Sequence, residues 1–107
     1  MMTETDHKIA ERLKTLMLER GLPIEEVIVF GSRARGDFEE DSDLDLFIVV
    51  SHKDRQIKDA IGDCCWEVGY ELEIMIQPVV MTREERYNSP QRSSLLVKAI
   101  REEGIRV

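Results

Sequence analysis

Apolar side chains recur along this chain with two different periods, and each period predicts a different kind of element. Near the N-terminus, one helical face is formed by residues spaced three and four apart: Ile9, Leu13, Leu16 and Met17. The spacing predicts an amphipathic helix over residues 6–20, ended by Gly21 and Pro23. Such a helix covers a sheet with its apolar face.

Two later segments carry the same helical period. Residues 53–69 form the first, and Gly69 is placed as its C-terminal cap. Its apolar stripe consists of Ile57, Ala60, Ile61, Cys64, Cys65 and Val68. The second segment begins after residues 88–90 and runs to about Glu103, where Gly104 terminates it. Its stripe consists of Leu96, Ala99 and Ile100.

Shorter apolar runs predict three strands. Val27–Phe30 is continuously apolar, as in a strand that is buried on both faces. Asp43–Val50 follows a polar, acidic segment over Asp37–Ser42. In residues 71–77, apolar and polar positions alternate: Leu72, Ile74 and Ile76 against Glu71, Glu73, Met75 and Gln77. Strands covered by helices place the chain in the α/β (α+β) class.

Composition narrows the classes of partner. A chain of 107 residues forms one domain, here 1–107. Its 15 basic and 22 acidic residues give a net charge of −7, which argues against extended nucleic-acid binding. No apolar run is long enough for a signal peptide or a membrane span, so we expect a cytoplasmic protein without membrane contact. The adjacent Cys64 and Cys65 fit core packing rather than a disulfide or zinc site.

The candidate chemistry lies between the first two strands. Gly31-Ser32 ends the first strand, and ten residues later Asp43-Leu44-Asp45 opens the second. A glycine turn that leads into a short helical segment presents backbone N–H groups and a hydroxyl to a phosphate. The two aspartates leave one face of the strand about 7 Å apart, a spacing at which they can share divalent cations. The plainer interpretation is a helix cap followed by a solvated strand entrance.

Two other motifs fail at these positions. A calcium loop that begins at Asp41 requires glycine at its sixth position and glutamate at its twelfth, but Leu46 and His52 occupy these positions. A P-loop requires Lys and Ser or Thr where Asp37 and Phe38 stand.

Gly-Ser-Arg-Ala-Arg-Gly over 31–36, followed by Ser-Asp-Leu-Asp-Leu over 42–46, resembles the signature of minimal members of the DNA polymerase β-type nucleotidyltransferase superfamily. The resemblance implies a small mixed sheet backed by helices and transfer of a nucleoside monophosphate, with AMP from ATP the expected case. It implies that Gly31 and Ser32 bind the triphosphate and that Asp43 and Asp45 bind Mg²⁺ or Mn²⁺.

The same resemblance calls for a third carboxylate on the neighbouring strand, as a metal ligand and catalytic base. Glu73 is the candidate, and Glu71 on the same face stays open as the alternative. Arg33 and Arg35 are candidates for pairing with the phosphates. Trp66 and Tyr70 are expected in the core or at its rim rather than as a platform for stacking a base.

Minimal nucleotidyltransferases of this kind are often paired with HEPN proteins, a family of RNA-cleaving toxins, and some transfer AMP to a tyrosine of that partner. The resemblance therefore implies an antitoxin that modifies such a partner. We expect the acidic segment 37–42 to lie near the acceptor and the tail Ile105–Val107 to contribute contacts. A non-catalytic antitoxin that binds nucleotide, a small-molecule nucleotidyltransferase and a homo-oligomer remain open.

Overall fold

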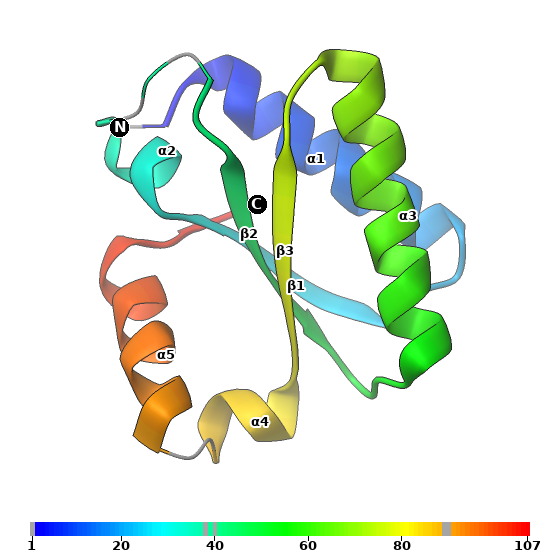
Figure 1. The fold of residues 1–107 in the computed structure, drawn as a ribbon. Helices are drawn as coiled ribbons and strands as arrows, with labels where there is room; N and C mark the ends of the chain where they lie inside the picture. The colour runs from blue at the N-terminus through cyan, green and yellow to red at the C-terminus, as the bar shows by residue number, and fades with distance from the viewer. Residues whose placement is uncertain (1, 38, 40, 89–90) are drawn as a thin grey trace.

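A four-stranded mixed sheet forms the centre of the computed structural model, which describes residues 2–37, 39, 41–88 and 91–107 (Figure 1). The strands are β1 (Ile24–Phe30), β2 (Leu44–Val50), β3 (Ile76–Thr82) and β4 (Ile105–Arg106). Their order across the sheet is β3-β2-β1-β4. β2 and β3 run parallel, while β1 is antiparallel to both of its neighbours, β2 and β4. The mixed sheet confirms the predicted fold class.

Five helices in the described part of the chain surround this sheet: α1 (Glu4–Glu19), α2 (Ser32–Arg35), α3 (Arg55–Leu72), α4 (Arg83–Tyr87) and α5 (Gln91–Glu103). The longer ones begin at capping side chains. Thr3 accepts the N–H of Asp6 at the start of α1, and Asp54 accepts that of Ile57 at the start of α3. α1 and α3 pack together over one face of the sheet, and α5 packs on the other (Figure 1).

β2 separates the two halves of the core because its side chains alternate between the faces. One alternate set is buried against α1 and α3: Leu44, Leu46, Ile48 and Val50. The other set includes Phe47 and Val49, which pack with Ile100 of α5 and Ile28 of β1. Cys64 and Cys65 are free and buried in the first cluster, and burial raises the pKa of Cys65 to about 12. Their predicted packing role is confirmed.

The prediction of a strand over residues 71–77 is wrong. α3 continues to Leu72, Glu73 follows with a left-handed φ of 56°, and β3 begins only at Ile76. Gly69 lies inside the helix rather than at its end, since a Cβ there would lie 2.5 Å from the Ile74 carbonyl oxygen of the returning chain. The glycine therefore permits the tight turn after α3.

The C-terminal tail has a role within the fold that the sequence did not predict. Ile105 pairs with Val29, and the Val107 N–H donates to the Val27 carbonyl at 2.9 Å. Ile105 and Val107 both pack against the cluster beneath α1. The tail therefore completes the sheet, and its contacts with a partner stay a prediction.

Candidate active site

The turn after β1 brings Gly31 against Asp45. Gly31 has φ 77°, a conformation that favours glycine, and it precedes the four residues of α2. β1 and β2 pair so that Phe30 lies opposite Asp45. A Cβ on Gly31 would collide with the Asp45 carboxylate. The predicted glycine turn and the predicted acidic strand thus meet in direct contact.

Asp43 and Asp45 lie at the start of β2, on the same sheet face that α5 covers farther along the strand. Asp43 precedes β2 and is exposed, whereas Asp45 lies within the strand and is half-buried. Burial raises the pKa of Asp45, and the neighbouring Asp43 carboxylate raises it further, while Arg35 acts in the opposite direction. Two carboxylates held together against their repulsion are a donor set that suits a hard divalent cation.

Gln77 occupies the position on β3 where a third carboxylate was expected. It pairs with Asp45 in the parallel register, and its Nε2 lies 3.5 Å from Oδ2 of Asp43. Among the described residues, no three His, Cys, Asp or Glu side chains form a group that could hold a metal ion. Alternation along a sequence does not reveal which residues face each other across a parallel pair, so sequence reasoning missed Gln77.

The two predicted third carboxylates lie elsewhere. Glu71 is in the last turn of α3, where its Oε2 accepts a hydrogen bond from Arg12 at 2.6 Å. Glu73 is exposed in the turn between α3 and β3. Neither lies on β3, because the alternating pattern of residues 71–77 spans the end of a helix and a turn. Their assignment to a strand face beside Asp45 is therefore wrong.

The structure gives the two arginines of the motif different surroundings. Arg33 is buried, and it donates to Oδ1 of Asp6 at 2.8 Å and to the Ser42 carbonyl at 2.9 Å. Its contacts connect α1, α2 and the residue before Asp43. Arg33 therefore holds the elements around the site in place. Arg35 is exposed, bonds Asp37 and Glu103, and influences the pKa of Asp45. Arg35 is the better placed of the two to meet a phosphate.

Trp66 and Tyr70 lie outside the core. Their side chains are 71% and 76% exposed on α3, which contradicts the prediction of buried or rim positions. Their rings stack with centroids 5.2 Å apart and an interplanar angle of 11°. The helical period placed them on α3 but did not indicate that their face of the helix lies toward solvent.

The chain matches one protein family over nearly its full length. The sequence profile of the nucleotidyltransferase domain covers residues 8–107. A relative from Methanocaldococcus jannaschii, described as a putative protein adenylyltransferase, is 34% identical over 58 residues. That match covers 53% of this chain and 59% of the relative, so the aligned part spans about six-tenths of that protein.

Within the described residues, no helix is both long and apolar enough to cross a membrane.

Several solved structures share the fold. One described as a putative minimal nucleotidyltransferase is 26% identical with a TM-score of 0.66, covering 98% of this chain and 95% of the other. A toxin-antitoxin structure with AMP-PNP has a TM-score of 0.66 at 14% identity, over 91% and 70% of the two chains. A complex of a tri-AMPylated Shewanella oneidensis HEPN toxin with its MNT antitoxin has a TM-score of 0.61 at 12% identity, over 94% and 70%.

Proposed function

This chain belongs to the nucleotidyltransferase domain family, and on that premise we propose that it transfers AMP from ATP to a hydroxyl group of a partner protein. One observation supports this function above the others: Gly31 packs directly on Asp45 beside Asp43, as a phosphate turn adjoining a pair of metal ligands would require. The relative described as a protein adenylyltransferase supports the acceptor class. The fold shared with antitoxins of HEPN toxins supports a HEPN-type partner.

A divalent cation fits the carboxylate pair. Asp43 and Asp45 would hold Mg²⁺ or Mn²⁺. Burial first and the Asp43 charge second raise the pKa of Asp45, and a bound cation would offset both effects. Bound there, the ion supplies charge neutralisation for the phosphates of ATP. Gly31 leaves room for close approach, and Ser32 and Arg35 lie in the adjoining turn as donors.

The transfer balances without any further reactant. The acceptor hydroxyl oxygen forms a bond to the α-phosphorus, the bond from that phosphorus to the bridging oxygen breaks, and pyrophosphate leaves. The hydroxyl proton passes to a carboxylate of the pair. Glu73 and Glu71 have no part in this scheme, because the turn and the Arg12 ion pair hold them elsewhere.

Gln77 favours a second function, that of an antitoxin that acts by contact alone. A neutral amide at the third position removes a group that could accept the acceptor's proton. In that case the protein would bind its partner, and nucleotide, without modifying the partner.

The deciding experiment combines the protein with Mg²⁺, ATP and a HEPN-type partner, followed by mass spectrometry of the intact partner. We expect a mass increase of one or more AMP groups, which is lost on chelation and in the double variant Asp43→Asn/Asp45→Asn. The double variant should remain folded, since removing two repelling charges relieves strain in the metal-free protein. Asp59→Asn, an exposed change on α3 away from the acidic segment 37–42, is the matched control.

An unmodified partner that still forms a complex would establish the contact antitoxin instead. Modification that persists in the double variant would remove the aspartates from the site.

A further inference from the structure

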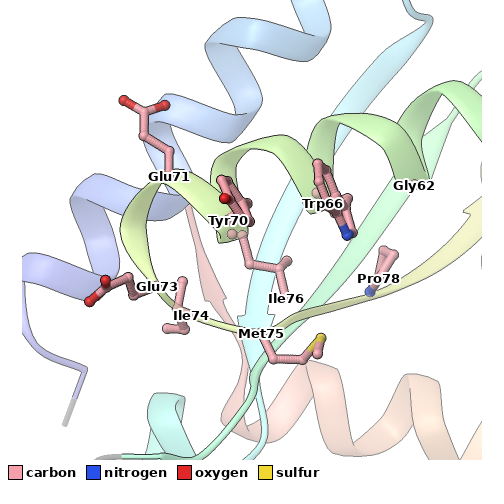
Figure 2. Close-up of a pocket in the computed structure, with 11 residues that line it drawn as sticks. Gly62, Trp66, Tyr70, Glu71, Glu73, Ile74, Met75, Ile76 and Pro78 are labelled. Carbon is pink, nitrogen blue, oxygen red and sulfur yellow. The ribbon is translucent and has the colours of Figure 1, made fainter.

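A cleft of about 680 Å³ lies between α3 and the beginning of β3, with the core residues Cys65 and Ile76 among its lining residues. Figure 2 shows Trp66 and Tyr70 on the helix above it, with Met75 and Pro78 on the chain below. Gly62 and Gly69 belong to the helical wall of the cleft. The small residues and the flanking aromatic rings give this part of the surface a hollow, largely apolar shape.

The cleft has the composition of an interaction surface. Trp66 is 71% exposed, Tyr70 76% and Met75 61%, so three large side chains lie together in solvent. Trp and Tyr are the residues most enriched among those that dominate binding energy, and Met is enriched at interfaces. None of the three is needed to fill the core. Their exposure therefore calls for a partner that covers them.

Charge identifies the kind of partner. Glu71 and Glu73 are the charged residues lining the cleft, and no Lys or Arg is among its described lining residues. The whole chain has a net charge of −7. This acidic setting disfavours both a phosphate-bearing ligand and a second copy of the chain. Glu71 already pairs with Arg12, so Glu73 is the carboxylate that would attract a basic side chain, which could also stack on the exposed rings.

The cleft adjoins the candidate active site along the backbone. The Met75 carbonyl accepts a hydrogen bond from the Leu44 N–H at 2.9 Å, and Leu44 directly follows Asp43. Two residues beyond Met75, Gln77 faces the carboxylate pair. The helical wall of the cleft lies on the sheet face covered by α1 and α3, and the carboxylates lie on the other face. Because β3 is an edge strand, a protein seated in the cleft would reach Asp43 around this edge, at Met75.

We propose that this cleft docks an apolar, basic segment of the protein that receives AMP. The identity of the docked protein rests on the proposed function, whereas the docking itself does not require transfer. Docking beside the carboxylates gives the small domain a means of selecting its acceptor, since binding holds the hydroxyl close to the site.

The test uses two variants that alter the cleft without altering the core. Gly62→Arg introduces bulk and positive charge at a position where an added Cβ meets nothing within 4 Å. Trp66→Ser/Tyr70→Ser removes the exposed rings. Gly62→Ala is the control for the first variant. Leu95→Ser, which changes another exposed apolar side chain (74% exposed, on α5), is the control for the second.

Calorimetry with the HEPN-type partner should show that both cleft variants bind at least about tenfold more weakly than wild type. Both controls should bind with the wild-type affinity. Metal-dependent ATP binding should be the same in all five proteins. Trp66 is the chain's single tryptophan, so its fluorescence in wild type should shift to the blue when a tryptophan-free partner segment covers it.

The outcomes separate docking from transfer. Loss of affinity in the cleft variants together with an unmodified partner would uphold docking and overturn transfer. AMP transfer with equal affinity in all variants would overturn docking, as would an absence of partner binding in wild type. Sedimentation that shows a wild-type dimer abolished by Gly62→Arg would assign the cleft to a second copy and also overturn the proposal.

Discussion

Gln77 decides how many carboxylates the site can offer. Its place opposite Asp45 follows from the parallel register of β2 and β3, which brings together residues more than thirty positions apart. The sequence supports the prediction of Gly31, Asp43 and Asp45 as one site because they flank one short connection between two neighbouring strands. It does not support the choice of Glu73, because local alternation looks the same in a strand and in a helix end followed by a turn.

Gln77→Glu tests whether this position faces a cation. A third carboxylate beside Asp43 and Asp45 should tighten Mn²⁺ binding, measured by calorimetry, and should lower the thermal stability of the metal-free protein through added repulsion. Gln56→Glu, an exposed change on α3 with the same charge, should alter neither property. Equal Mn²⁺ affinity in Gln77→Glu and wild type would show that the side chain does not face the ion.

At the scale of elements, a buried ion pair holds α1 against the motif. Asp6 and Arg33 are 2% and 7% exposed, and the second oxygen of Asp6 has no hydrogen-bond partner among the described residues. Removing one member of a buried pair leaves the other charge without compensation, which is costlier than replacing both. The pair therefore makes the short α2 depend on the first turn of α1.

Arg33→Met should accordingly destabilise the fold by about 3–5 kcal/mol, measured by urea unfolding. The double variant Asp6→Leu/Arg33→Met should recover much of that loss, because no buried charge remains. Arg35→Met, on the exposed side of the same helix, should change stability little. A small effect of Arg33→Met would contradict the buried pairing and return Arg33 to the phosphate site.

Elements with a repeating apolar face were mostly predictable, whereas β3, α4 and β4 were not. α1, α3, α5, β1 and β2 have apolar faces that repeat within the element, and each lies close to its predicted range. α4 spans Arg83–Tyr87 and depends on a capping box between Thr82 and Glu85. β4 has two residues and exists because β1 is present to pair with it. α4 and β4 therefore depend on a local cap and on pairing with a distant strand, and neither produces a repeating pattern of apolar residues in the sequence.

At the scale of the whole molecule, residues 105–107 add the edge strand β4 to the sheet and contact α1. Lys14 donates to the Val107 carbonyl at 2.8 Å, while Ile105 pairs with Val29 of β1. A chain ending at Gly104 should lose about 2–4 kcal/mol of stability, since it leaves half-buried apolar surface and backbone groups of β1 uncovered. Thermal unfolding measures the loss, with Arg101→Ala as an exposed control on α5.

If the truncated chain melted at the wild-type temperature, the tail would be dispensable for folding. Its residues would then be available to a partner, as the sequence alone suggested.

The outer margins of the sheet bear on how the protein behaves when it is crowded. Both end strands are poor templates for a neighbouring molecule: β4 has two residues, and β3 carries Pro78 in its interior. Proline offers no N–H to an incoming strand, and a two-residue strand offers too few pairs. Concentrated solutions should therefore resist ribbon-like polymerisation through backbone pairing. Pro78→Val introduces a backbone N–H at this edge and a residue that favours strands, so this variant should form fibrils more readily than wild type.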